Sequence, residues 1–460
     1  RAYELSNFYQ EAVQTYIHVE NLAKESGCLE LLLSAQVEHA RLISTPTPVF
    51  DTEISHRLCR QALKLARQLK DPASEARIHW IFMLSYWLAD SQKAIKHGLR
   101  SLQIARAHHL QEQLAYTLHD LHRAYSSAGD IPHAQEALRE AGLLWRTLGN
   151  LPLLADNLAS SADQAIDDGR YEEALNFANE ADQISRTIGN LWSQAYAQEM
   201  IGIVRMEYGQ VDAAIHHLQE SIRMARLAGV KVLVYRSASE LASLYHLLGA
   251  VAEVEALTDL IAMFMEEYKD TNDRFRFISL QGIRSITAVY CNDLEKATRL
   301  IHESDQRLDS ISPNLVKPMI AKVQVLIAQH QFEEAIRLGD GLITLIDQHK
   351  AGRFKSQILI LKSKALLGQQ DLDGAWRVLV QAHASVQKRN AHIYLPHILS
   401  LLVKTARLRH DPATAENYRQ QAQASIERLL SNTSDPSIRD TFLKHPEIQF
   451  VLSEGAGNGS

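Results

Sequence analysis

The sequence contains few of the residues that interrupt helices or carry reactive chemistry. Its 460 residues include 20 glycines, 11 prolines and three cysteines. The glycines and prolines fall mostly at turn positions, which favours an all-helical chain. The cysteines, Cys28, Cys59 and Cys291, are isolated and form no CxxC pair, so the sequence predicts neither a zinc site nor a redox pair.

Motifs for catalysis and cofactor binding are also missing. No GxxxxGK[ST] loop and no GxGxxG after a strand occur, so no phosphate-binding loop is predicted, and no GxSxG nucleophile turn is present. Adjacent histidines such as His108-His109 and His216-His217 project from different faces of a helix, which disfavours metal binding. We therefore predict no catalytic residue, no metal site and no cofactor.

Charge and hydropathy exclude further classes of function. The net charge of −6 is mild for this length, so direct nucleic-acid binding is not expected. No apolar run approaches the length of a membrane span and no signal peptide is recognisable, so we predict a cytoplasmic protein without membrane contact. The chain begins with Arg1, and its first predicted helix lacks a partner, so we expect a fragment of a longer protein.

What the sequence does contain is a repeat of about 40 residues. Gly129, Gly169 and Gly209 are spaced at this interval, and a small residue follows each glycine five positions later. A fixed period of this size is typical of a solenoid. Within residues 115–150, an apolar stripe predicts one helix, which Gly129 ends, and Asp130 is placed to cap the next helix.

The small residue marks the second helix of each predicted helical pair, where it lets two helix axes approach closely. The same register finds an alanine at nine positions: Ala12, Ala94, Ala134, Ala174, Ala214, Ala297, Ala335, Ala375 and Ala415. At Ser55 and Val254 the register continues with another residue. We therefore predict an all-α, right-handed α-solenoid, or superhelix, of about eleven helical hairpins. Neither helix of a pair can bury its stripe alone, so stacking on neighbouring pairs should stabilise the array.

The chain divides into four predicted segments. Residues 1–270 form the first part of the solenoid, and residues 271–430 continue it after a polar insertion at 270–273, which is the best candidate for a hinge. Residues 431–452 form a C-terminal capping helix with a short hydrophobic clip. Residues 453–460 are rich in glycine and serine and are predicted to be disordered.

The repeat resembles a known family. Leu121-His122, Tyr125, Ala134, Leu138 and Ala141 match the tetratricopeptide (TPR) pattern of a bulky–small pair, an aromatic residue and a small-residue stripe. The repeat is longer than the usual 34 residues and is similar to the TPR arrays of bacterial multidomain signal-transduction ATPases of the maltose-activator type. The C-terminal segment 438–448 also resembles the end of such arrays in regulators joined to ATPase or cyclase domains.

This resemblance implies a non-enzymatic domain that senses a ligand or partner and regulates an attached ATPase or effector module. Its partner would be a protein or peptide, or a small-molecule inducer, together with the upstream module of the same chain. The alternative is a constitutive scaffold without sensing, and an enzyme of another type is the least favoured reading.

The resemblance also places a binding surface on the concave side, which the first helix of each pair lines. The predicted groove residues are Tyr116, His119, Arg123, Asp156, Asp163, Tyr196, Glu199, Arg236, Ser243 and His246. Their mixture of charges and tyrosines suits a peptide or a polar small molecule, although any polar solenoid face would look similar. We predict that Arg123 and Arg236 anchor an acidic group, while Tyr116 and Tyr196 pack on its carrier.

Overall fold

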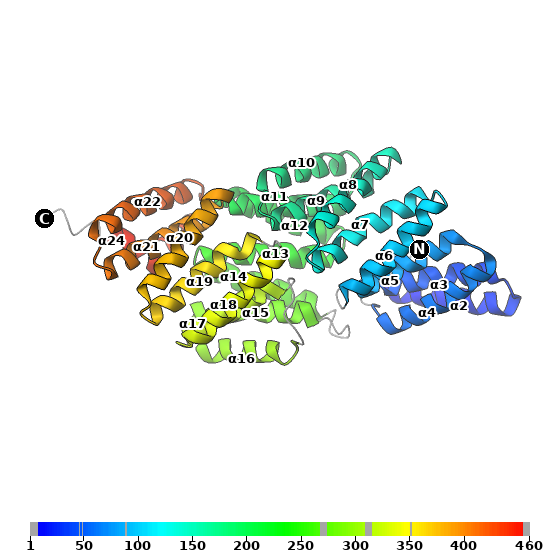
Figure 1. Ribbon diagram of the computed structural model, residues 1–460, viewed down its shortest axis with the longest axis horizontal. Coiled ribbons are helices and arrows are strands. Elements are labelled where there is room, and N and C mark those ends of the chain that lie inside the picture. Colours follow the sequence, from blue (N-terminus) through cyan, green and yellow to red (C-terminus); the bar gives the residue numbers. More distant parts are fainter. Residues whose placement is uncertain are drawn as a thin grey trace. The chain divides into compact units, whose positions relative to one another are not determined.

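The computed structural model describes residues 8–45, 47, 49–87, 90–266, 274–308, 315–349 and 352–453. These residues form 23 α-helices, labelled α2–α24, and two short 3-10 helices, η2 and η3 (Figure 1). No strand occurs in these ranges. Most of the long helices pack against the next one along the chain, so the predicted all-helical solenoid of hairpins is confirmed.

The chain forms two compact units, and the division falls within α9, between Ser161 and Ala162. The described part of unit 1 runs from residue 8 to residue 161. Its helices are α2 (Tyr9–Ser26), α3 (Leu29–Ile43), α4 (Thr52–Leu69), α5 (Pro72–Tyr86), α6 (Ser91–Ala107), α7 (Gln111–Ser127), α8 (Ile131–Thr147) and the first part of α9 (Leu151–Asp167).

Unit 2 covers the rest of α9 and the described residues up to 453. Its first helices are α10 (Tyr171–Thr187), α11 (Leu191–Glu207), α12 (Val211–Leu227), α13 (Lys231–Leu247), α14 (Val251–Glu266), α15 (Arg274–Tyr290) and α16 (Leu294–Asp305). They are followed by α17 (Val316–Ala328), α18 (Phe332–Gln348), η2 (Gly352–Phe354), α19 (Lys355–Gly368), α20 (Leu372–Arg389), η3 (His392–Tyr394), α21 (Leu395–Leu408), α22 (Pro412–Ser431), α23 (Pro436–Leu443) and α24 (Pro446–Ser453). None of the helices described is long and apolar enough to span a bilayer.

The small-residue register of the sequence corresponds to buried positions in the second helix of each pair. All nine alanines of the register are at most 2% exposed, and Ser55 and Val254 are fully buried. A larger side chain at these positions would hold the two helices apart, because the interface between two packed helices has no spare volume. The register prediction is confirmed in both units.

The predicted turns are also present, and residues of several types build them. Gly129 ends α7 with φ +79°, and the Asp130 carboxylate accepts a hydrogen bond from the backbone N–H of His133 at the start of α8. Later turns use other residues in the same left-handed conformation, among them His330 and His410. Glycine is therefore favoured at these turns but not required at all of them.

Unit 2 packs its C-terminal helices against the turns of its earlier pairs. A Cβ atom on Gly169 would lie 2.5 Å from Cδ of Arg389, at the end of α20. At the turn one repeat later, a Cβ on Gly209 would lie 3.3 Å from Cδ1 of Leu429, on α22. At α12, the backbone N–H of Asp212 donates to the carbonyl oxygen of Asn432 (3.0 Å). The turn glycines thus supply close approach as well as positive φ.

The C-terminal cap differs in detail from the prediction. Residues 436–453 form two short helices, α23 and α24, rather than one helix followed by a clip. Phe442, Ile448 and Val451 are buried at 1%, 0% and 0% exposure, whereas Leu452, the last residue of the predicted clip, is 36% exposed. α24 packs on α21 and α22, so it covers part of the last long hairpin. The predicted hinge at 270–273 and the predicted tail at 454–460 lie outside the described residues.

Candidate functional site

The ten predicted groove residues lie on α7, α9, α11 and α13, which are all first helices of their pairs. The division within α9 separates them into two sets. Unit 1 contains Tyr116, His119, Arg123 and Asp156, and unit 2 contains Asp163, Tyr196, Glu199, Arg236, Ser243 and His246.

A groove of about 840 Å³ opens in unit 1 along α3, α5 and α7. These are the first helices of three successive pairs, which is the side that the resemblance predicted for binding. We call this hollow the unit 1 groove. Its lining residues are Glu30, Leu33, Ser34, Val37, Glu38, Arg41, Leu69, Asp71, Ala73, Ser74, Arg77, Trp80, Leu110, Gln111, Glu112, Gln113 and Tyr116. Of the ten predicted residues, Tyr116 alone belongs to it.

Two aromatic side chains give the unit 1 groove a rigid apolar wall. The Tyr116 ring lies 5.8 Å from that of Trp80 and packs edge-on against Trp145, with centroids 5.0 Å apart. The Trp80 indole N–H donates to Oδ2 of Asp120 (2.8 Å), one repeat further along the chain. The ring contacts and this hydrogen bond hold Trp80 and Tyr116 in place. Binding at this surface would therefore cost little conformational entropy in these two side chains.

The charged residues of the unit 1 groove are predominantly acidic. Its lining contains four carboxylates and two arginines. Both arginines, Arg41 and Arg77, pair with the same acid, Glu38, at 2.9 and 2.6 Å. Glu30 and Glu112 are exposed. The unit 1 groove therefore presents an apolar wall beside an excess of negative charge.

The other predicted residues of unit 1 do not line this groove. His119 is 7% exposed, and its ring lies between Asp156 (Nε2 to Oδ2, 3.3 Å) and Asn157 (Nδ1 to Nδ2, 3.3 Å). The Arg123 guanidinium lies over the ring of Trp87, 5.9 Å from its centre. These contacts join neighbouring helices within unit 1.

In unit 2, the predicted groove residues form ion pairs with one another. The Arg236 guanidinium donates through Nη2 to Oδ2 of Asp163 (2.9 Å) and through Nε to Oε1 of Glu199 (3.0 Å). The same guanidinium lies 5.0 Å from the centre of the Tyr196 ring, whose hydroxyl donates to Asp163 (3.1 Å). Anchoring of an acidic ligand by Arg236 remains a prediction, and it would require both ion pairs to open.

Burial outweighs this pairing at Glu199. Its side chain is 1% exposed, and Oε2 has no hydrogen-bond partner. Burial is the main reason that the pKa of Glu199 is raised to about 7. The positive charge of Arg236 lowers this pKa, but the nearby carboxylates of Asp163 and Glu240 raise it. Burial likewise raises the pKa of Asp167, one helical turn beyond Asp163 on α9.

Two cations from later repeats, Arg353 and Lys317, pair with carboxylates close to Glu199. We call the set the central ion cluster, and its members are Asp163, Glu199, Glu207, Arg236, Glu240, Lys317 and Arg353. Arg353, on η2, donates from Nε to Oε1 of Glu207 (3.1 Å) and from Nη2 to Oε2 of Glu240 (2.7 Å). Lys317, on α17, pairs with Glu240 as well. Arg353 and Lys317 offset the cost of burying Glu240 and hold its pKa well below the ordinary value. The 40-residue period does not predict Arg353 and Lys317 here, because it does not indicate which later helices pack back on α11 and α13.

The last two predicted residues lie further along α13. The Ser243 hydroxyl donates to the backbone carbonyl of Ser239 (2.9 Å). His246 is 7% exposed, bonds through Nε2 to the Thr287 hydroxyl (3.1 Å) and stacks on Tyr290. Burial lowers the pKa of His246 to about 3, so the ring is neutral at physiological pH.

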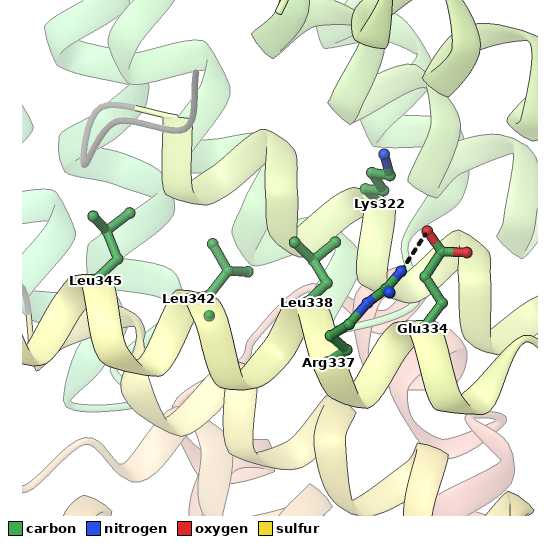
Figure 2. A pocket seen from close by; sticks show the side chains of 7 residues that line it. Lys322, Glu334, Arg337, Leu338, Leu342 and Leu345 are labelled. Carbon is green, nitrogen blue, oxygen red and sulfur yellow. Dashed lines mark ion pairs between the residues drawn. The ribbon is translucent and has the colours of Figure 1, made fainter. Parts of the chain in front are cut away.

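A smaller hollow of about 340 Å³ lies in unit 2 beside α18. Figure 2 shows Leu338, Leu342 and Leu345 in a row along this helix, with the Glu334–Arg337 ion pair (3.6 Å) at one end. Leu342 is buried, and the other two leucines pack against the same apolar cluster around α17–α19. The residues that line this hollow belong mainly to α18, so fewer side chains converge on it than on the unit 1 groove.

Comparison with known families identifies the repeat. The family described as the MalT-like TPR region matches residues 82–385, about two thirds of the chain. The chain belongs to this TPR family. The match begins within α5, includes the lining residues of the unit 1 groove from Leu110 to Tyr116, and extends through the central ion cluster to α20. A TPR-type helical repeat is consistent with a role in protein interaction or regulation. No curated protein matches the sequence.

Several solved structures are similar to this TPR chain at low identity. The apo form of RapI is 14% identical, with a TM-score of 0.44, and the match covers 56% of this chain and 99% of RapI. A Rap protein in complex with the competence and sporulation factor is 11% identical, with a TM-score of 0.44 and coverages of 87% and 99%. Yeast Tom70 is 13% identical, with a TM-score of 0.35 and coverages of 88% and 92%.

Proposed function

We propose that this TPR domain binds a partner peptide in the unit 1 groove and uses that binding to regulate an attached ATPase or effector module. The groove favours an extended segment with an aromatic or aliphatic anchor next to a lysine or arginine. The anchor would pack on Tyr116 and Trp80, and the basic residue would face Glu30 and Glu112. The supporting observation is the combination of a fixed aromatic wall and an acidic excess in one groove.

We assign no catalytic step to the chain. In unit 2 the charged side chains described above pair with one another, and in the unit 1 groove the Ser74 hydroxyl donates to the carboxylate of Asp71, the residue that caps α5. A small-molecule inducer is the competing ligand for a sensor. The spread of the groove over three helices favours an extended peptide.

Peptide selection on the intact chain tests this proposal. A random peptide library displayed on phage should yield sequences with an aromatic or aliphatic residue near a basic one. Binding of a selected synthetic peptide, measured by fluorescence anisotropy, should weaken about tenfold or more in Tyr116→Ala and in Glu112→Lys. Glu255→Lys, at an exposed position on α14, is the matched charge control and should bind like the parent.

Arg123→Ala provides the comparison with the acidic-anchor hypothesis. If that variant loses peptide binding while Tyr116→Ala keeps it, the unit 1 groove is not the site. Hydrogen exchange then separates a sensor from a constitutive scaffold. A sensor bound to peptide should change amide protection in unit 2 as well as on α3, α5 and α7, whereas a scaffold should change only those three helices.

A further inference from the structure

The C-terminal cap of unit 2 brings together three side chains of types that bind transition metals. They are His397 on α21, His445 between α23 and α24, and Glu447 on α24. One ligand atom from each residue can be chosen such that all three atoms lie within 4.8 Å of one another. Two imidazoles and one carboxylate are a donor set that zinc uses where a fourth position is left open.

The surrounding hydrogen bonds orient two of these residues. His397 directs Nε2 to the backbone carbonyl oxygen of Leu247 (3.1 Å), and its Nδ1 faces Oε2 of Glu447 at 2.9 Å. Metal-binding histidines commonly donate their second ring N–H to a carbonyl oxygen, which fixes the tautomer and aims the other nitrogen at the ion. Lys364 pairs with the opposite oxygen of Glu447, Oε1 (2.5 Å), and so leaves Oε2 directed at His397.

The third residue contains an unsatisfied polar atom. Nδ1 of His445 is buried and has no hydrogen-bond partner, although the ring packs edge-on against His397 with centroids 4.9 Å apart. Leaving a buried nitrogen unpaired is costly, and few native groups do so without a reason. An ion placed between the two rings and Glu447 would satisfy it.

We propose that His397, His445 and Glu447 form a binding site for a divalent transition metal of the zinc class. The ligand atoms are Nδ1 of each histidine and Oε2 of Glu447, and a water molecule or a partner's side chain takes the fourth position. The ion replaces the hydrogen bond between His397 and Glu447, and the Nδ1 proton of His397 leaves to solvent. Lys364 keeps its pairing with Oε1.

Such a site would fasten the cap to two earlier parts of unit 2. Glu447 lies one residue before the buried Ile448, and His397 connects α21 to the last carbonyl group of α13. Metal binding would therefore resist the release of α23 and α24 from the body of the unit. The inference is independent of the peptide-binding proposal, which concerns unit 1.

Metal titration of the intact, chelator-treated chain tests the site. Isothermal titration with Zn²⁺ should show one equivalent bound per chain, and metal should raise the melting temperature. Co²⁺ should give the visible d–d absorption of a four-coordinate site without a thiolate band. His445→Ala should weaken binding at least about tenfold, since it removes one of three ligands, and should still fold because it also removes the orphaned nitrogen.

Two controls keep the result specific. His302→Ala, at an exposed position on α16, and Cys291→Ser, which removes the exposed thiol, should both bind Zn²⁺ like the parent. A circular dichroism melt without metal checks that each variant is folded. The proposal is overturned if folded His445→Ala binds as tightly as the parent, if Cys291→Ser loses binding, or if the parent binds no stoichiometric ion.

Discussion

Replacing Glu199 by glutamine should stabilise unit 2 at alkaline pH and leave it nearly unchanged at acidic pH. Glu199 is buried, one of its oxygens is unpaired, and burial raises its pKa from 4.5 to about 7. Glutamine keeps an oxygen for the N–H of Arg236 and removes the need to bury a negative charge. Asp163 remains as the partner of Arg236.

The sign follows from proton linkage. Between the unfolded pKa near 4.5 and the folded pKa near 7, the native state holds a proton that the unfolded state releases, so the free energy of unfolding falls as pH rises through this window. Above the window the loss is complete. Each pKa unit corresponds to about 1.4 kcal/mol, so ionising this carboxyl group costs the parent roughly 3 kcal/mol at about pH 8. Glu199→Gln should recover an amount of that order.

Hydrogen exchange is the appropriate assay, because a repeat protein of this length need not unfold in a single transition. Opening free energies of amides on α11 and α13 should converge between parent and variant near pH 5 and diverge towards pH 8, with the variant more stable. Glu255→Gln, on the exposed face of α14, should show no such divergence. A variant less stable than the parent at pH 8 would refute the reasoning, since it would mean that the ionised Glu199–Arg236 pair is a net stabilising contact.

Three further changes test the packing. Ala174→Leu should destabilise the chain by roughly 1–3 kcal/mol in thermal or urea melts, because Ala174 is fully buried at a helix crossing, whereas parent-like stability would disprove the register. Arg353→Met should cost about 3–5 kcal/mol, because it leaves Glu207 and Glu240 buried without their shared cation. Removing residues 436–460 should cause aggregation, measured by light scattering, since Ile438, Phe442 and Ile448 are buried in the cap; removal of 454–460 alone is the control.

The sequence was sufficient to predict the fold because its main requirement recurs at a fixed spacing. Close helix crossings favour small side chains, and Ala134, Ala174 and Ala214 mark three of them in this sequence. Turns with positive φ favour glycine, which marks Gly129 and Gly169. In the later pairs, His330 and His410 occupy the same conformation without glycine, and there the alanine register had to define the repeat.

The site could be predicted only in part, because polar residues on neighbouring first helices can satisfy one another. His119 with Asp156 and Glu199 with Arg236 are both pairs one repeat apart on adjacent first helices. Considered singly, each of these four residues lies at a position of the repeat that predicts a groove residue. Taken together, opposite polarity at a spacing of one repeat indicates an internal bond, and this signal was available in the sequence.

Other parts of the site depend on contacts that no local pattern encodes. Arg353 reaches Glu207 and Glu240 across 146 and 113 residues of chain, and these contacts form only when unit 2 packs back on its own turns. The same applies to His397, whose partners are Leu247 and Glu447. Periodicity predicts which residues neighbour one another in successive repeats, but not which later repeat returns to an earlier one.

The charged residues on the first helices are paired differently in the two units. In unit 2, Arg236 pairs with the partly exposed Asp163 and the buried Glu199, and Arg353 pairs with the buried Glu240, so an acidic ligand would have to break these contacts. In unit 1, the cations of the groove are held by Glu38, while the exposed Glu30 and Glu112 carry the excess charge beside Trp80 and Tyr116. Charge complementarity at this face thus favours a basic ligand over an acidic one, the opposite of what Arg123 and Arg236 suggest when they are considered singly.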